Sequence, residues 1–417
     1  MKKFFRKIFQ FFQSNNTNKY IIELALFLIA LFFLFYLATT DVVSNVMGVV
    51  VGFLVSSMFL YAFKVLAGWL EDTLKVNDDT EAMYQIYTGS DAYKKTLTSA
   101  DTSVNFIYDD VISGDEGPFL VEDHPEKHFQ LDDFILENYD RIFSAHSNSA
   151  KRNFLTIRLD DYDPKTKTIY LSRSTYFNHL LTNRAADFRL FENVSLRDIY
   201  EYGPNLTPLA ESKMSNHIGI NGLVFLEDGR LLLPRRGGSS TISKNQITSS
   251  IAVMLNFPNE CSKHPENAVI TADYLLRSNI IKNLSDRVKI LPESIDETQV
   301  SIRFLGLGRN FYEVGKPQFY YSVVLHGIDT KKYFRLREEY YEEQKRKNVK
   351  DFLDVDKLMY AADLKSFRYI KDTIRFDTYD ENNKKSSVTV GYEKSFLCNL
   401  WHYEQDQAIT PKDISAS

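Results

Sequence analysis

The sequence predicts a two-helix transmembrane hairpin followed by a cytosolic α/β (α+β) region, and three observations support this fold class. Two uncharged runs lie near the N-terminus, separated by the short break at residues 39–41. Residues 1–70 carry six basic and two acidic residues, which leaves 44 basic and 53 acidic residues downstream. The downstream part alternates strand-like and helix-like segments separated by turn residues, as mixed α/β domains do.

The first uncharged run is LALFLIALFFLFYLATT, and the second is VVSNVMGVVVGFLVSSMFLYAF at residues 42–63. The 22 residues of the second run would cover about 33 Å as a helix, close to a bilayer core of about 30 Å. We therefore expect membrane spans at 20–40 and 43–67, after a basic leader at 1–19. A cleaved signal peptide is the alternative. Signal peptides usually have a shorter apolar part and are not followed at once by a second apolar run, whereas this chain has both a longer first run and a second one.

The orientation of this hairpin follows from its flanking charges. The leader carries four basic residues before the first run, whereas the hairpin tip carries only Asp41. Basic residues stay on the cytoplasmic side, so we expect both termini in the cytoplasm. Gly48, Gly52 and Ser56 recur every four residues and would form a packing face within the hairpin or between protomers. Ordinary composition of a membrane helix explains the same stripe.

The composition of the whole chain excludes several classes of protein. The chain has 417 residues, 44% of them hydrophobic and 14% aromatic, with 17 Gly and 11 Pro, so it is neither collagenous nor globally disordered. A net charge of −5 argues against a nucleic-acid polymer as partner. The two cysteines, Cys261 and Cys398, are far apart and form no CxxC pair, which argues against a disulfide scaffold or a structural zinc site.

The downstream part divides into three segments. Residues 71–100 are polar and read as a connector, and residues 101–215 form an α/β region whose fold the pattern does not name. Within that region LTIRLDDYDPKTKTIYLSR predicts a hairpin, and SRSTYFNHLLTNRAADF predicts a helix. Residues 216–417 follow, with a core at 217–330 in which the order β, β, β, α, β, β is expected, then a charged helix at 331–350 and an apolar helix around Trp401.

Motifs for known chemistry are mostly missing from the sequence. It has no HExxH, no Walker P-loop and no GxSxG motif. His124 and His128 have a metal-like spacing, but the intervening Pro125 and the acidic loop favour surface histidines. We therefore predict no catalytic residue, no metal ligand and no cofactor.

The segment GLVFLEDGRLLLPRRGG, together with FLGLGRNFYEVGKPQFYYSVVLHG, carries the clearest family signal. A strand, an Asp-Gly turn, a leucine-rich strand ending in two arginines and a glycine pair resemble the opening of the Nudix domain, over about residues 217–330. The resemblance implies an α/β/α sandwich. It also implies a GX5EX7REUXEEXGU box that holds magnesium against a diphosphate.

That box is not kept, because the matching segment reads ENAVITADYLLRSNIIKNL and its acidic residues are Glu266 and Asp273. REEYYEEQ at 337–344 is out of register with the box and follows the core strands. We therefore expect a fold that binds a nucleotide without cleaving it. The candidate ligand-binding residues lie at the end of the second strand and in the loop after it, where Arg suits bidentate phosphate contacts: Arg235, Arg236, Lys244, Asn245 and Gln246.

Two apolar segments, a cytosolic body and a degenerate Nudix-like domain together resemble the CBASS antiphage effectors that combine two transmembrane helices with a NUDIX domain. In that bacterial system a CD-NTase makes a cyclic oligonucleotide and the effector responds to it. The resemblance implies a cyclic oligonucleotide, the lipid bilayer and a second copy of the chain as partners, a bacterial inner-membrane location, and abortive infection through membrane disruption. A membrane-anchored Nudix hydrolase of a nucleoside diphosphate derivative and a ligand-free membrane scaffold are the alternatives.

Overall fold

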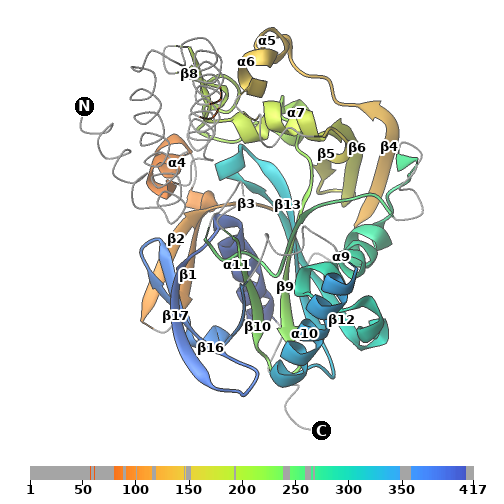
Figure 1. The fold of residues 1–417 in the computed structure, drawn as a ribbon. Helices are drawn as coiled ribbons and strands as arrows, with labels where there is room; N and C mark the ends of the chain where they lie inside the picture. Colours follow the sequence, from red (N-terminus) through yellow and green to blue (C-terminus); the bar gives the residue numbers. More distant parts are fainter. Residues whose placement is uncertain are drawn as a thin grey trace, which may run out of the picture. The chain divides into compact units, whose positions relative to one another are not determined.

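A computed structural model describes residues 57, 61, 79–87, 91–99, 101–114, 119–144, 146, 152–191, 194–237, 245–258, 264–265, 268–347 and 358–409. Residues 73–417 form one compact unit. Within this unit a large mixed sheet runs through the centre, and helices and smaller sheets pack around it (Figure 1).

The described part of the central sheet has ten strands. Eight follow the order β15-β16-β14-β10-β9-β13-β12-β3, while β11 pairs with β9 and β17 pairs with β16. Only β9 and β13 pair in parallel, and the remaining pairs are antiparallel. The strands are β3 (Asp109–Ser113), β9 (Gly219–Leu226), β10 (Leu231–Arg235), β11 (Ile251–Met254), β12 (Val300–Asn310), β13 (Lys316–Leu325), β14 (Leu358–Ala362), β15 (Arg368–Ile370), β16 (Thr373–Tyr379) and β17 (Lys385–Gly391).

Strand β9 is buried along its whole length, because helices cover both faces of the sheet. Its side chains alternate between two cores: Val224 packs on one face and Phe225 on the other. The first core includes side chains of α9 (Asn279–Val288), which follows a π-helical turn at Tyr274–Ser278, and of α10 (Thr330–Arg346). The second core includes side chains of α11 (Lys394–Ile409).

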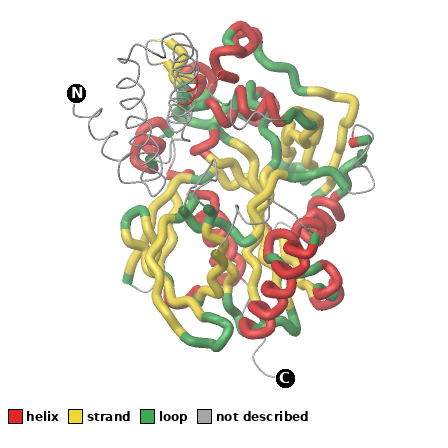
Figure 2. The backbone as a smooth tube through the Cα atoms, in the orientation of Figure 1, coloured by secondary structure: helices red, strands yellow, loops and turns green. Residues whose placement is uncertain are grey.

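A second group of elements precedes β9 in the sequence. Strands β4 (Leu120–His128), β5 (Leu155–Asp163) and β6 (Thr168–Thr175) form a three-stranded sheet, which lies beside α7 (Tyr176–Leu181) in Figures 1 and 2. The remaining short elements are α4 (Thr80–Ile86), β1 (Lys94–Ser99), β2 (Thr102–Ile107), α5 (Asp133–Glu137), α6 (Tyr139–Ser144), β7 (Arg189–Phe191), β8 (Val194–Ser195) and α8 (Leu196–Tyr200).

Several expected elements are confirmed. The order β9, β10, β11, α9, β12, β13 is the expected β, β, β, α, β, β, and α10 and α11 occupy the two expected C-terminal helices. The expected hairpin is β5 and β6, which pair antiparallel. The helix expected in SRSTYFNHLLTNRAADF is shorter than the pattern suggested, because α7 ends at Leu181 and a 3₁₀ turn follows at Asn183–Ala185. The hairpin β1–β2 begins inside the expected connector.

The predicted fold class is corrected in its membrane part. In the portion of the chain that the structure describes, no helix is both long and apolar enough to cross a membrane. The longest helices described, α10 with 17 residues and α11 with 16, are charged and shorter than the roughly 20 residues that a span needs. This finding also counts against the predicted multi-pass inner-membrane location. The predicted spans 20–40 and 43–67, with Gly48, Gly52 and Ser56, lie outside the described residues apart from 57 and 61.

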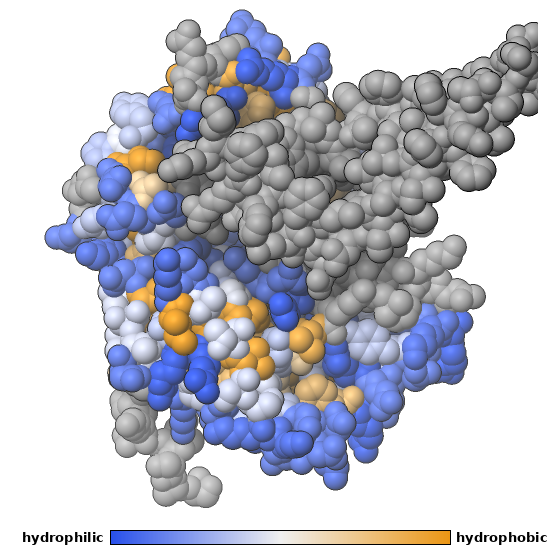
Figure 3. All heavy atoms as spheres, turned by 60° about the vertical axis from the view of Figure 1, so that its left-hand side comes forward, coloured by the Kyte–Doolittle hydropathy of each residue, from blue (hydrophilic) through white to orange (hydrophobic). Residues whose placement is uncertain are grey.

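The surface seen in Figure 3 shows how apolar residues are distributed on one face of the described chain. Hydrophobic residues there lie in small groups between hydrophilic ones. Small groups of this kind are normal for a folded protein, since much of any protein surface is apolar.

Candidate anion-binding site

The predicted ligand-binding residues meet at the end of β10. The Arg236 amide donates to the Gln246 carbonyl at 3.0 Å, and the Asn245 amide donates to the Arg236 carbonyl at 3.1 Å. The Arg235 guanidinium donates through Nε to the Asn245 carbonyl at 3.1 Å, so it helps to hold this turn. The structure thus brings four of the five predicted residues together, while Lys244 lies outside the described residues.

Arg236 has a different environment from Arg235. Arg235 ends β10 and donates within its own turn, whereas no such contact holds the Arg236 guanidinium among the described residues. The positive charge of Arg236 interacts with that of Arg184, in the 3₁₀ turn after α7. Arg184 belongs to a group of polar side chains that the sequence analysis did not single out.

We call this group the histidine–arginine cluster, and it gathers residues from segments far apart in the sequence. His146 follows α6, His179 lies on α7, and Lys316 begins β13. His217 lies just before β9, and its ring stacks on that of His179 with centroids 3.7 Å apart and planes at 24°. The cluster consists of His146, His179, Arg184, His217 and Lys316, with Arg236 at its margin.

The cluster contains buried nitrogen atoms without hydrogen-bond partners among the described residues. They are Nε2 of His146, Nδ1 of His179, Nη1 of Arg184 and Nδ1 of His217. The three histidines are 3–5% exposed, so solvent does not replace these partners. A buried donor without an acceptor costs about 1–3 kcal/mol, and more when it is charged. Arg184 Nη1 is always a donor, and each imidazole nitrogen is a donor in one of the two neutral tautomers, so an acceptor-rich ligand would complete these groups.

The electrostatics of the cluster also favour an anion. Burial lowers the pKa of His179 and His217 well below the usual value, and the charges of Lys316 and neighbouring groups lower both further. Burial and the Arg184 charge lower the pKa of His146 to about 4. Burial likewise lowers the pKa of Arg184. The histidines are therefore neutral at pH 7, in a place where additional positive charge is unfavourable.

Two carboxylates face the cluster and balance part of its charge. Glu313 accepts from Lys316 Nζ at 3.1 Å, and both side chains are nearly buried. Glu393 interacts with Arg184 through its charge, but its Oε2 has no hydrogen-bond partner among the described residues. With neutral histidines, the three cations Arg184, Arg236 and Lys316 exceed the two carboxylates by one charge. A phosphodiester group, with one negative charge, would neutralise this local excess and accept from several donors at once.

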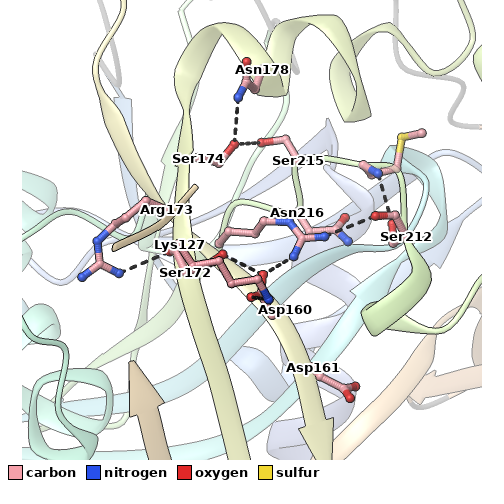
Figure 4. A network of polar contacts seen from close by, with 12 residues as sticks. Lys127, Asp160, Asp161, Ser172, Arg173, Ser174, Asn178, Ser212, Ser215 and Asn216 are labelled. Atoms are coloured by element: carbon pink, nitrogen blue, oxygen red, sulfur yellow. Dashed lines mark hydrogen bonds and ion pairs between the residues drawn. The ribbon is translucent and has the colours of Figure 1, made fainter. Parts of the chain in front are cut away.

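Hydrogen bonds between segments hold the cluster in place. Asn183 Nδ2 donates to Asn216 Oδ1 at 3.2 Å and to the Glu313 carbonyl at 3.1 Å, which connects the turn after α7 with the segments before β9 and β13. In Figure 4 the hydroxyl groups of Ser174 and Ser215 point toward one another, and their oxygens lie 2.7 Å apart. His217 follows directly on these fixed residues, so its ring position is determined by the fold.

A network below these residues anchors the same segment to β5 and β6. Asp160 accepts from Lys127 Nζ at 2.6 Å and from Ser172 Oγ at 2.7 Å, and it also pairs with Arg158 (Figure 4). Arg158 Nη2 donates to the Ser212 carbonyl at 3.2 Å. The charges of Asp160, Lys127 and Arg158 are thus used within the scaffold, in contrast to those of the histidine–arginine cluster.

Metal binding has no geometric support in the described part of the chain, where no three His, Cys, Asp or Glu side chains are arranged around a common metal position. His124 and His128 lie on the half-buried strand β4, where His124 Nδ1 is 3.4 Å from Glu126 Oε1 and the His124 side chain is 42% exposed. They are surface histidines, as expected. Of the two acidic residues at the place of the Nudix box, Asp273 accepts from Ser278 Oγ at 2.8 Å and Glu266 lies outside the described residues.

Comparisons with known proteins assign no family to this arrangement. The sequence matches no protein-family model, and it matches no curated protein. What the cluster can bind is therefore inferred from its own residues.

The buried histidines predict a specific dependence of stability on pH. A histidine whose folded pKa lies below 6.5 binds protons more readily in the unfolded chain, so folding stability is full above pH 6.5 and falls as pH decreases toward the folded pKa. For His146, with a pKa of about 4, the loss between pH 7 and pH 5 is about 2 kcal/mol. We expect His146→Gln to reduce the difference in unfolding free energy between these pH values by that amount, measured by urea denaturation.

His128→Gln is the control for this experiment, because His128 is an exposed histidine on β4. The control should retain the pH dependence of the parent protein. Equal pH dependence in His146→Gln and the parent would contradict the burial of a neutral imidazole at position 146.

Proposed function

We propose that this protein is a non-enzymatic sensor that binds a phosphate-bearing nucleotide at the histidine–arginine cluster. The observation that carries the proposal is the set of buried, unpartnered nitrogens on His179, Arg184 and His217. Phosphate oxygens only accept hydrogen bonds, whereas Arg and Lys only donate them, and a neutral imidazole can present a donor at either nitrogen. The N–H donors of the cluster can therefore pair with the acceptor oxygens of a phosphodiester.

The resemblance to CBASS effectors suggests the class of nucleotide, a cyclic oligonucleotide made by a CD-NTase. Such a ligand carries several phosphates, so Arg236 at the margin of the cluster could serve a second one. An effector responds to a signalling nucleotide by binding it. The absence of the Nudix glutamates from the sequence favours such binding over cleavage. The alternative of a Nudix hydrolase is kept as an outcome of the experiment.

Binding at the cluster would couple two parts of the fold. The cluster takes residues from α7 and its following turn, and also from the start of β13 in the central sheet. A ligand that binds both sets favours the arrangement in which they lie together, and it stabilises that arrangement by its binding free energy. In this proposal the same preference selects the assembly state of the protein that transmits the signal.

The test uses the full chain with a panel of cyclic di- and trinucleotides in the presence of Mg²⁺. Binding is measured by isothermal titration calorimetry, and the recovered nucleotide is analysed by chromatography. Saturable binding with intact nucleotide is the expected result. Magnesium-dependent turnover would replace the sensor with the hydrolase, and failure of every nucleotide to bind would refute the proposed function.

Single substitutions at the two arginines test which of them meets the ligand. Arg236 interacts with Arg184, whereas Arg235 donates to the Asn245 carbonyl within its own turn. We expect Arg236→Ala to weaken nucleotide binding about tenfold, in keeping with one lost charge-assisted hydrogen bond. Arg235→Ala is the matched control and should change the affinity much less. A larger loss in Arg235→Ala would place the ligand on the other face of β10.

A further inference from the structure

A series of neighbouring rings, with two stacked pairs joined by one tilted contact, leads from the surface into the histidine–arginine cluster. Phe154 stacks on Tyr176 with centroids 4.9 Å apart and planes at 8°. Tyr176 is followed by His179 at 6.4 Å and 36°, and His179 by His217 at 3.7 Å and 24°. The series begins at an exposed side chain, since Phe154 is 43% exposed, and ends at one that is 3% exposed.

Phe154 is held firmly despite its exposure. Its carbonyl accepts from the Tyr176 amide at 2.9 Å, and its own amide donates to Asn153 Oδ1 at 3.1 Å. The same Asn153 oxygen accepts from the Phe177 amide at 3.0 Å, in the first turn of α7. These bonds fix the backbone of Phe154 at the start of the helix that carries His179, and the stack on Tyr176 orients its ring. Binding against the ring would therefore require little ordering of the protein.

We propose that Phe154 is a stacking platform for a nucleobase of the same ligand whose phosphate binds at Arg184. This inference rests on the proposed function and adds recognition of the base to it. Tyr176 covers one face of the phenyl ring, and a planar base would continue the stack on the other. Burial raises the pKa of the Tyr176 hydroxyl, and the nearby charge of Arg184 opposes this rise.

The chemistry of the Phe154 ring indicates which part of a ligand it recognises. A phenyl ring has no hydrogen-bonding group, so it recognises the flat surface of a base and not its edge. Stacking of a base on an aromatic side chain contributes about 5- to 100-fold in affinity and tolerates different bases. The ligand class is therefore a nucleotide, in preference to inorganic phosphate, pyrophosphate or a sugar phosphate.

The experiment compares two probes on the full chain by calorimetry: cyclic di-AMP, which carries bases, and pyrophosphate, which carries none. Phe154→Leu removes the ring and keeps apolar bulk, and we expect it to weaken cyclic di-AMP binding about 5- to 100-fold without changing pyrophosphate binding. Phe154→Trp should restore or strengthen the binding of cyclic di-AMP. Thermal unfolding of each variant establishes that the fold is retained.

Tyr202→Leu is the matched control, because the Tyr202 ring is 74% exposed and lies outside the series from Phe154 to His217. It should bind both probes as the parent does. If Phe154→Leu binds cyclic di-AMP unchanged while Arg184→Met does not bind it, the platform is refuted and the proposed function stands. An equal loss of both probes in Phe154→Leu also refutes the platform. If cyclic di-AMP does not bind the parent protein, the tightest-binding nucleotide of the panel replaces it as the probe. If no nucleotide of the panel binds, the proposed function fails, and the platform fails with it.

Discussion

The Arg184→Met variant is expected to lose binding of a phosphate-bearing nucleotide by about 100-fold while the free protein becomes more stable. The loss corresponds to one or two charge-assisted hydrogen bonds, which contribute about 1.5–3 kcal/mol each. Methionine keeps most of the aliphatic volume of the arginine side chain. The variant therefore removes the charge and the donors with little change in packing.

The gain in stability follows from the unpartnered Nη1 of Arg184. Burial lowers the pKa of this arginine, which means that the folded protein disfavours its charge. Replacing it should raise the free energy of unfolding of the free protein by about 1 kcal/mol, the lower end of the cost of an unsatisfied buried donor. Binding is measured by calorimetry and stability by urea denaturation. A residue that served only the fold would show the opposite pattern, with reduced stability in the variant.

Arg335→Met provides the matched control, because Arg335 lies on α10 with its side chain 67% exposed. We expect this variant to retain both affinity and stability. Reduced stability of Arg184→Met together with parental affinity would contradict the assignment of the cluster to a ligand.

The Asp123→Ala variant is expected to destabilise the protein by about 3–5 kcal/mol, the cost of leaving a buried charge unpaired. Asp123 accepts two hydrogen bonds from Arg173, at 2.6 and 2.9 Å, and the side chains are 1% and 0% exposed. The same pair joins the three-stranded sheet to a loop, because Arg173 also donates to the Ala268 carbonyl and Asp123 accepts from the Ile270 amide. Urea denaturation measures the loss.

The double variant Asp123→Leu with Arg173→Met should recover part of this loss, since it removes both charges together. Glu342→Ala is the control, because Glu342 pairs with Lys345 at 2.6 Å on the surface, where the two side chains are 61% and 60% exposed. An exposed pair of this kind contributes at most about 1 kcal/mol. Similar losses in Asp123→Ala and Glu342→Ala would show that burial of the Arg173 pair has no special cost.

The segment from 217 to 330 shows which structural elements can be predicted from the local sequence pattern. Its apolar runs, the Asp-Gly turn at 228–229 and the helical spacing after residue 268 predict the elements from β9 to β13 in their correct order. These features act over a few neighbouring residues, so the sequence carries them directly. The four strands β14 to β17 were not expected, because short strands at the edge of a sheet depend on their pairing partners more than on their own residues.

The candidate site could not be predicted in the same way, because tertiary contacts create it. Arg235 and Arg236 were found from their place at a strand end, but the sequence could not tell which of the two has a charge that interacts with Arg184. A single histidine in an apolar helix such as α7 has the same local pattern whether it is structural or functional.

The sequence by itself determined the order of strands and helix over residues 217–330, the absence of a Nudix glutamate box and the candidate arginines at the end of β10. The tertiary structure alone decided that His146, His179, Arg184, His217 and Lys316 meet, since up to 170 positions separate them along the chain. It also decided which of their nitrogens lack partners. The physical reason is that burial and hydrogen-bond satisfaction depend on all surrounding segments at once, whereas periodicity and turn chemistry depend only on near neighbours in the chain.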